Sequence, residues 1–394
     1  MKLVQINVVC NGSTGKIMCD IAKTAEQRGF ETTCFYGRGL PNKNVHCVKI
    51  GNNISIKLHG LLARLGFNGH GSYFLTKRLV KNLKKINPDI IHLHNLHGYY
   101  INLKVLFKYL KGYNRKIIWT LHDCWPFTGH CCYFTIQNCN KWKKCCNNCP
   151  QLSSYPKELF DTTKREYKLK KKIFTNLENL TIVTPSLWLA SLVKKSFLSC
   201  YPISVINNGI DLDVFKPTVD KKIYDKYNIP KNKKIILGVA NIWDKRKGLD
   251  DFVELSKIIN HNYCIVMVGV NKEVKKILPD NVISIERTDN QEELAKIYTI
   301  SDIFFNPSKE ETFSLVTAEA IACGRPVAIY GNSAIIELVN KQNGIILDVN
   351  DNLQSNWSKV LQFLDNAKIR RDVSCITKFE IKDMINKYLD EYMN

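Results

Sequence analysis

A chain of 394 residues, of which 45% are hydrophobic and 24% charged, can form two hydrophobic cores, and its composition excludes fibrous and intrinsically disordered proteins. It contains no run of 18 apolar residues and residues 3–6 already resemble a strand, so we expect a cytoplasmic protein without a signal peptide, its 15 cysteines mostly reduced. The net charge of +21 lies in the first half: residues 1–205 hold 31 lysines and arginines against nine acids, whereas residues 206–394 hold 26 against 27. Such a basic half is either simply solvated or attracts nucleic acid or anionic lipid.

The first predicted strand covers residues 3–9, and a glycine-containing loop over residues 10–16 leads into a helix. Glycines at a strand-to-helix turn allow backbone amides to approach a phosphate, so Gly15 is a candidate binding residue. The loop is not a Walker A motif, because that motif requires glycine where this chain has Cys10 and serine or threonine where it has Ile17.

After a strand over residues 32–36, we expect an irregular region up to Ser72, because asparagine, glycine and histidine are frequent there. The segment Tyr73–Ile86 then predicts an amphipathic helix with lysines and arginines between its apolar residues. Such a helix either packs on the sheet with a solvated basic face or places that face on an anionic membrane.

Three histidines lie in and after a predicted strand over residues 89–94. No carboxylate accompanies His92, His94 and His97 in this run, so we interpret them as pocket or core residues rather than metal ligands.

A His122–Asp123 pair follows the next predicted strand, residues 116–121. Enzymes of the α/β class place their chemistry at the carboxyl ends of strands, so His122 is the strongest histidine candidate for catalysis.

Residues 129–151 contain six cysteines, four of them with the spacing C-x7-C-x6-C-x2-C. This spacing favours a structural zinc site over a disulfide framework, with unligated or redox-labile cysteines as the alternative. Four protein ligands leave a metal no open position for catalysis. The proposed ligands are Cys131, Cys139, Cys146 and Cys149.

The charge balance changes near residues 206–218, and strands alternating with helices begin again after this boundary. This pattern predicts an α/β protein with two doubly wound parallel sheets. We expect a first domain over residues 1–205, with a cysteine-rich insertion at about 124–150, and a second over residues 206–376. A helical segment over residues 377–394 is expected to cross back to the first domain.

Two carboxylates, Glu311 and Glu319, have seven residues between them in a strand-loop-helix-strand segment over residues 305–330. Polar residues form the loop, and Thr312 or Ser314 can cap the helix. Open sheets bind anionic ligands at such turns, although two solvated acids on a surface helix would give the same pattern.

These residues together resemble a known enzyme family, the retaining nucleotide-sugar glycosyltransferases of family 4, which have two Rossmann-like domains facing each other across a cleft, the GT-B fold. Residues 122–151 are closest to the branch that builds colanic-acid-like and other bacterial surface polysaccharides, including capsule and exopolysaccharide. The residues that carry the resemblance are Glu311, Phe313, Glu319, Ala320, Gly324, Pro326 and Val327, the segment Asn208, Gly209, Ile210, Asp211, Phe215 and Pro217, and the run Arg246, Lys247 and Gly248.

The resemblance implies a role for each candidate residue. Arg246 and Lys247 would neutralise a diphosphate leaving group without a metal cofactor, helped by the amides of Ser314 and Leu315. Many relatives have an arginine where this chain has Asn241, so the diphosphate contacts differ here. Retention in this family is ascribed to front-face attack, which needs no carboxylate nucleophile. Of the remaining candidates, Glu319 would bind the ribose, Glu311 the transferred sugar, His122 the donor sugar and Gly15 the phosphate.

The resemblance implies a hexosyltransferase that uses a nucleoside diphosphate sugar and a lipid-linked or oligosaccharide acceptor. We expect no nucleic-acid partner and a peripheral position on the anionic inner face of the plasma membrane. Two alternatives remain: a zinc-stapled basic protein that binds nucleic acid, and a nucleotide-sugar epimerase of the same fold.

Overall fold

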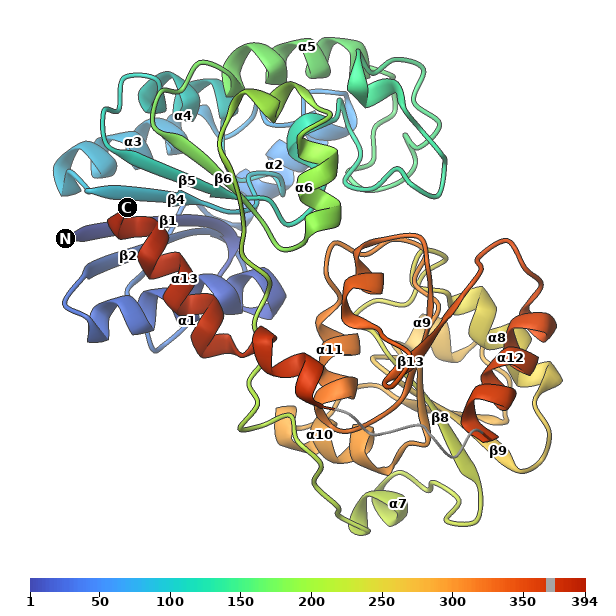
Figure 1. Cartoon of the computed structure of the whole chain (residues 1–394). Helices are drawn as coiled ribbons and strands as arrows, with labels where there is room; N and C mark the ends of the chain where they lie inside the picture. The colour runs from blue at the N-terminus through green and yellow to red at the C-terminus, as the bar shows by residue number, and fades with distance from the viewer. Residues whose placement is uncertain (366–372) are drawn as a thin grey trace. The chain divides into compact units, whose positions relative to one another are not determined.

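The strands pair in parallel into two separate sheets, one in each of two units. The computed structural model describes residues 1–365 and 373–394. The first unit comprises Met1–Asn207 and Ile385–Asn394, and the second comprises Asn208–Met384. Helices cover the faces of each sheet (Figure 1). The predicted α/β class with two Rossmann-like parallel sheets is confirmed.

The first unit contains a seven-stranded sheet whose order reverses between β1 and β4. In sheet order, its strands are β3 (Cys47–Lys49), β2 (Glu31–Arg38), β1 (Lys2–Val9), β4 (Ile90–Leu93), β5 (Lys116–Thr120), β6 (Leu180–Thr184) and β7 (Ile203–Val205). Its helices include α1 (Gly12–Gln27), α2 (Asn53–Arg64), α3 (Tyr73–Ile86), α4 (Leu103–Leu110), α5 (Thr163–Phe174) and α6 (Leu187–Val193), with 3-10 turns η1 (Trp125–Phe127), η2 (Lys141–Lys143) and η3 (Phe197–Cys200).

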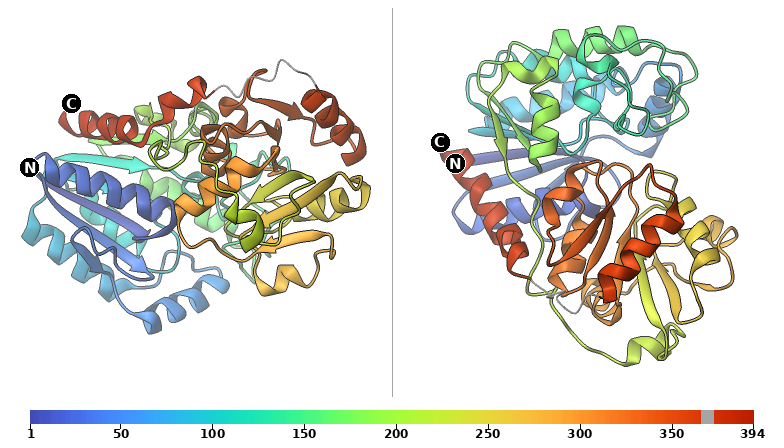
Figure 2. Two further views of the ribbon diagram at one scale, coloured as in Figure 1. Left: turned by 90° about the horizontal axis from the view of Figure 1, so that it is seen from below. Right: turned by 45° about the vertical axis from the view of Figure 1, so that its right-hand side comes forward.

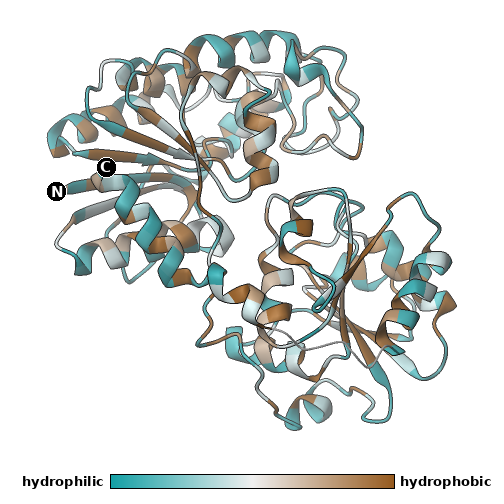
Figure 3. Ribbon diagram, viewed as in Figure 1, coloured by the Kyte–Doolittle hydropathy of each residue, from teal (hydrophilic) through white to brown (hydrophobic). Residues whose placement is uncertain are grey.

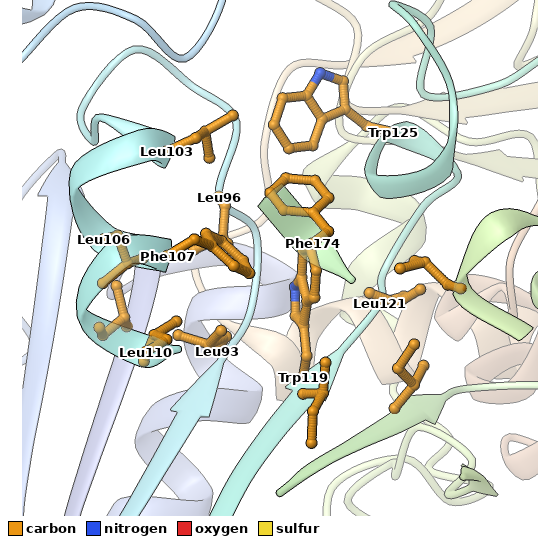
Figure 4. Close-up of a cluster of buried hydrophobic side chains, with 14 of the residues drawn as sticks. Leu93, Leu96, Leu103, Leu106, Phe107, Leu110, Trp119, Leu121, Trp125 and Phe174 are labelled. Atoms are coloured by element: carbon orange, nitrogen blue, oxygen red, sulfur yellow. The ribbon is translucent and has the colours of Figure 1, made fainter. Parts of the chain in front are cut away.

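Leucine and aromatic side chains fill the core between this sheet and helices α4 and α5 (Figure 4). The ring of Phe174 lies 4.5 Å from Phe107 and 5.0 Å from Trp119, the latter edge to face. The Trp119 indole donates a hydrogen bond to the carbonyl of His94 at 3.0 Å, which joins β5 to the residue after β4. This packing fixes the carboxyl ends of both strands.

The prediction of an irregular region before Ser72 was wrong, because this region contains β3 and α2. The side chain of Asn52 accepts a hydrogen bond from the Ser55 amide, and the Ser55 hydroxyl accepts one from the Asn52 amide. This capping box begins α2 in spite of the polar composition before it. The predicted helix α3 is confirmed, with Leu79 buried, but Phe74 is 80% exposed rather than on the apolar face.

The second unit repeats the same strand order in a six-stranded sheet. In sheet order, its strands are β10 (Val282–Ile285), β9 (Tyr263–Val268), β8 (Lys234–Val239), β11 (Ile303–Asn306), β12 (Val327–Tyr330) and β13 (Gly344–Leu347). Its helices include α7 (Lys222–Lys226), α8 (Leu249–Ile258), α9 (Lys272–Lys275), α10 (Gln291–Ile300), α11 (Leu315–Ala322) and α12 (Leu353–Asp365), with 3-10 turns η4 (Ala334–Leu338) and η5 (Ser374–Phe379).

The strands of both sheets are largely hydrophobic, whereas the helices alternate hydrophobic and hydrophilic residues (Figure 3). Strands buried on both faces are expected to be apolar throughout, as in β11, where all four residues are buried. Among the described residues, no helix combines the length and hydrophobicity needed to cross a membrane.

Helix α13 (Ile381–Met393) begins in the second unit, and its residues from Ile385 onward belong to the first. Figures 1 and 2 show this part beside α1. The Tyr392 hydroxyl hydrogen-bonds with His92 Nδ1 at 2.6 Å, and the Tyr388 hydroxyl with Thr120 at 3.1 Å. Both tyrosines are buried, so α13 completes the core beside β4 and β5.

Candidate active site

The second sheet reverses its strand order between β8 and β11, with β9 and β10 on one side and β12 and β13 on the other. Parallel sheets of this kind bind ligands at the reversal point, outside the carboxyl ends of the strands. Two loops begin there: residues 240–248 follow β8 and residues 307–314 follow β11. Five of the predicted site residues lie on these loops.

An ion pair between Lys247 Nζ and Glu311 Oε1 joins the two loops. The side chains are only 19% and 9% exposed. Two further bonds run beside it: Arg246 Nη1 donates to the Glu310 carbonyl at 3.0 Å, and the Lys309 amide donates to the Arg246 carbonyl at 2.8 Å. Because breaking a buried ion pair leaves an uncompensated charge, this pair holds the loops together.

The environment of Glu311 keeps it ionised. Burial alone would raise the pKa of its carboxyl group, but the charges of Lys247 and Arg246 outweigh burial and bring the pKa below its ordinary value. Glu311 is therefore a carboxylate at neutral pH. Two cations beside one anion leave a net positive charge, which suits a phosphate-containing ligand.

Gly248 allows the loops to approach each other. Its φ of 76° is in the left-handed region, and a Cβ atom there would lie 2.4 Å from Cγ of Pro307. A side chain at position 248 would therefore push the two loops apart.

Helix α11 follows the second loop and begins in a strained conformation. Ser314, its N-cap residue, has φ 83° and ψ 80°, and its side chain makes no hydrogen bond to a backbone amide of the first turn. Its hydroxyl instead contacts Asn306 Nδ2 at 3.1 Å and Thr317 Oγ1 at 3.0 Å. The amides from Leu315 onward thus form a helix N-terminus without a side-chain cap, where the helix dipole favours an anion.

Glu319 lies on α11 with its carboxylate held from α10. The Tyr298 hydroxyl donates a hydrogen bond to Glu319 Oε2 at 3.1 Å, and Tyr298 is fully buried. Asn241, the residue two positions after β8, is exposed on the first loop.

The first sheet reverses between β1 and β4, where three buried polar side chains form a hydrogen-bonded chain. Nε2 of His122 lies 3.1 Å from Nδ1 of His94, and Nε2 of His94 lies 3.0 Å from the side-chain oxygen of Gln5. The two histidine rings are stacked, with an interplanar angle of 11°. His94 therefore orients His122, which follows β5.

Burial lowers the pKa of His122 to about 4, so its imidazole is neutral at neutral pH. Asp123 faces a different histidine, His97, whose Nε2 lies 2.8 Å from Asp123 Oδ2. Asp123 also accepts a hydrogen bond from the Trp125 amide at 2.9 Å. The neutral His122 is suited to hydrogen bonding rather than to carrying a charge.

Gly15 was expected in a loop, but α1 begins at Gly12, so Gly15 lies in its first turn. A Cβ atom at Gly15 would lie 2.6 Å from the carbonyl carbon of Cys10. The glycine therefore allows α1 to pack directly against the end of β1.

Both halves of the chain match known family models. Residues 219–378 match "Glycosyl transferases group 1", and residues 14–214, half of the chain, match "Glycosyltransferase Family 4". This chain belongs to glycosyltransferase family 4. Neither the nucleic-acid-binding protein nor the epimerase is supported.

The glycosyltransferase resembles relatives along most of its length. It is 24% identical to a putative colanic acid biosynthesis glycosyl transferase, WcaC, of Escherichia coli, over 90% of this chain and 89% of that protein. It is also 24% identical to an uncharacterised protein in the cps region of Klebsiella pneumoniae, over 84% and 86% of the two chains. A crystal structure of Anabaena HepE in complex with UDP and glucose has the same fold, with a TM-score of 0.68, 14% identity and coverage of 100% and 99%.

The glycosyltransferase gathers its four predicted zinc ligands around one small pocket, which Cys131, Cys139, Cys146 and Cys149 all line. Cys131 hydrogen-bonds to Cys149, which lowers the pKa of the Cys149 thiol to about 6. Among the described residues, however, the sets of three or more ligand atoms within 4.8 Å of one another are formed by other residues. Zinc at this pocket stays a prediction.

The roles of two residues of the candidate site could not be predicted from the sequence. Tyr298 carried no signal, because its hydroxyl meets Glu319 only once α10 and α11 pack together. His94 was interpreted as a pocket or core residue, and only the pairing of β4 with β5 brings it to His122.

Proposed function

We propose that this glycosyltransferase moves a hexosyl group, with retention, from a nucleoside diphosphate sugar to a lipid-linked or oligosaccharide acceptor of surface polysaccharide. The observation that carries the proposal is the buried ion pair between Lys247 and Glu311 beside Arg246, at the strand reversal of the second sheet. The similarity to a colanic acid biosynthesis protein supports the polysaccharide product.

The cations supply the charge that the leaving group needs. As the sugar departs, negative charge develops on the diphosphate, and Arg246 and Lys247 stabilise it together with the N-terminus of α11. These groups make a metal ion unnecessary for this step.

Carboxylates bind the neutral parts of the donor. Glu319 accepts hydrogen bonds from the ribose hydroxyls while Tyr298 fixes its orientation, and Glu311, held ionised by Lys247, binds the sugar ring. His122, kept neutral by burial, hydrogen-bonds to the donor sugar. Because HepE, of the same fold, was crystallised with UDP and glucose, UDP-sugars are the first donors to test.

We assign the binding of the acceptor and of the membrane to the first unit. Four apolar side chains recur along α2 and its C-cap at the spacing of one helix face, and all are exposed: Ile54 (76%), Leu58 (59%), Leu61 (57%) and Leu65 (39%). The unit that carries this stripe is also the basic half of the chain. Apolar side chains on a basic unit suit a peripheral protein on anionic lipid, where a lipid-linked acceptor would be held.

Zinc is proposed as a structural metal at Cys131, Cys139, Cys146 and Cys149, where it would staple the insertion. The pocket that these cysteines share supports this assignment. Removal of the zinc is expected to destabilise the insertion, and the steps of the reaction themselves should not depend on it.

Sugar transfer from a panel of nucleoside diphosphate sugars tests the donor site. With the active donor, Lys247→Ala is expected to lower kcat/KM by about 10²–10³, the usual effect of removing one stabilising group from a developing anion. Lys245→Ala, which changes an exposed lysine of the same loop, is the matched control and should stay within about twofold. Wild-type kcat/KM in a folded Lys247→Ala protein would remove this lysine from the site.

Co-sedimentation with vesicles tests the membrane surface. Binding to phosphatidylglycerol vesicles should exceed binding to phosphatidylcholine vesicles and fall at high salt. Replacing Leu58 and Leu61 by aspartate should abolish it, whereas Val219→Asp, at an exposed apolar residue of the second unit, should not. Equal binding by the Leu58/Leu61 double variant and the wild type would refute the assignment of this apolar stripe on α2 as the membrane-binding surface.

A further inference from the structure

Four cysteines, on or next to four different elements, form a cluster separate from the cysteine-rich insertion. Cys10 follows β1, Cys19 lies on α1, Cys34 on β2 and Cys47 on β3. Their spacing along the chain, C-x8-C-x14-C-x12-C, resembles no metal motif, so they could not be grouped from their positions in the chain.

Three of the four thiols are close enough to share one ligand, and the fourth lies beside them. The sulfur atoms of Cys10 and Cys47 are 3.3 Å apart, and those of Cys10, Cys19 and Cys47 all lie within 4.8 Å of one another. Cys34 is directly opposite Cys47 in the parallel register of β2 and β3, and its thiol interacts electrostatically with those of Cys19 and Cys47. None of the four cysteines forms a disulfide.

The surroundings are those of a structural site. The four cysteines pack in one apolar cluster with Met18, Ala22 and Tyr36, and only Cys47 is partly exposed. The side chain of Asn42 hydrogen-bonds to Cys19, and its backbone hydrogen-bonds to Cys47. Donors of this kind around sulfur are typical of the outer shell of a metal–thiolate site.

The geometry matches a tetrahedral thiolate site better than a disulfide. Four sulfur atoms each 2.3 Å from a zinc ion at tetrahedral angles lie about 3.8 Å from one another. The sulfur atoms of Cys10, Cys19 and Cys47, all within 4.8 Å of one another, are near this arrangement, and Cys34 would complete it by a shift of its side chain toward them. A disulfide would join only two of the four cysteines and leave two buried thiols beside it.

We propose that Cys10, Cys19, Cys34 and Cys47 bind one Zn²⁺ ion as a closed structural site. The four thiols release their protons to solvent as four Zn–S bonds form, and no electron transfer takes place. With four protein ligands, the ion has no position for substrate.

The site would fix the turn between β1 and α1. Two of its ligands lie on either side of Gly15, and Gly15 packs against the backbone of Cys10. Zinc would therefore hold the first turn of α1 against the sheet, and this proposal does not depend on the identity of the donor.

The test is the zinc content of the full-length protein, measured by elemental analysis after dialysis against metal-free buffer. A Cys131→Ser/Cys149→Ser background first removes the other cysteine set from the measurement. In this background we expect about one zinc per chain, and at least a fivefold loss on adding Cys47→Ser. Adding Cys264→Ser instead, at a buried cysteine of the second unit, should change nothing.

Two further measurements cover a variant that fails to fold. The background protein loaded with Co²⁺ should show thiolate charge-transfer bands and the d–d bands of a tetrahedral sulfur site, and the absence of these bands would overturn the proposal. Unchanged zinc content in folded Cys47→Ser protein would also overturn it. So would a disulfide between Cys10 and Cys47 in freshly purified protein, seen as a loss of two hydrogens by mass spectrometry, because these thiols would then form a redox pair.

Discussion

At the scale of single residues, the site controls charge in two opposite ways. Cations keep Glu311 ionised despite its burial, whereas burial keeps His122 neutral. Both side chains are therefore in their proton-accepting forms at neutral pH.

Tyr298 gives a prediction at the same scale. Tyr298→Phe removes the hydroxyl that holds Glu319, so we expect KM for the donor to rise a few-fold with little change in kcat. The free energy of unfolding should fall by about 1 kcal/mol, the usual value of one hydrogen bond. Steady-state kinetics and urea denaturation measure both. Tyr224→Phe deletes a hydroxyl elsewhere in the unit as a control, and an equal rise in KM there would refute the role of Tyr298.

At the scale of elements, α11 begins at Ser314, which occupies a left-handed conformation. Its hydroxyl accepts a hydrogen bond from Asn306 of the preceding strand. Such strain persists only where the surroundings impose it, and it is common at ligand sites. Here it turns the chain so that the uncapped first turn of α11 follows the loop of Glu311. The backbone strain at Ser314 and the absence of a side-chain cap on α11 therefore arise from the same local conformation.

Two substitutions at Ser314 separate backbone strain from hydrogen bonding. Ser314→Val loses the hydroxyl and places a β-branched residue at φ 83°, so we expect a loss of about 2–4 kcal/mol in the free energy of unfolding. Ser314→Gly loses the same hydroxyl but relieves the backbone, and should cost no more than about 1 kcal/mol. Urea denaturation followed by circular dichroism measures this. Equal losses for the two variants would show that strain has no part.

Local signals explain what could be predicted of these elements. Several strands, such as those predicted over residues 3–9 and 116–121, were found from apolar runs. Helix α2 was missed because its capping box lies inside a polar stretch. The pairing of Lys247 with Glu311, 64 residues apart, depends on β8 lying beside β11, and no local pattern encodes strand order. Only the family resemblance brought these two residues together beforehand.

At the scale of the whole molecule, the two units differ in their response to acid. The first unit buries neutral histidines, including His59 and His122, both with a pKa of about 4 because of burial, and His92 and His94, whose pKa values burial also lowers. Below the ordinary value of 6.5 the unfolded chain binds protons that the folded unit does not, so stability falls as the pH drops from 6.5 toward 4. In the second unit, the pKa of Glu311 is lowered, and its contribution is lost only below about 4.5.

We therefore expect the first unit to lose stability before the second on acidification. At pH 5, each histidine with a folded pKa near 4 should remove about 2 kcal/mol from the free energy of unfolding. Hydrogen exchange, corrected for intrinsic rates, should show reduced protection in peptides from β4 and β5 between pH 7 and pH 5, with β8 and β11 unchanged. An equal loss in both units would contradict the histidine argument.

Helix α13 also determines when the first unit can finish folding during synthesis of the chain. The hydrogen-bond partner of His92 is Tyr392, which lies 300 positions later in the chain. A ribosome must therefore translate the whole second unit before the core of the first unit can be completed. At about 5–20 residues per second, the delay after residue 207 is about 10–40 s. During this time the side of β4 and β5 that α13 will cover is open to chaperones and to aggregation. A nascent chain stalled before residue 385 would present an unfinished first unit, however complete its own strands.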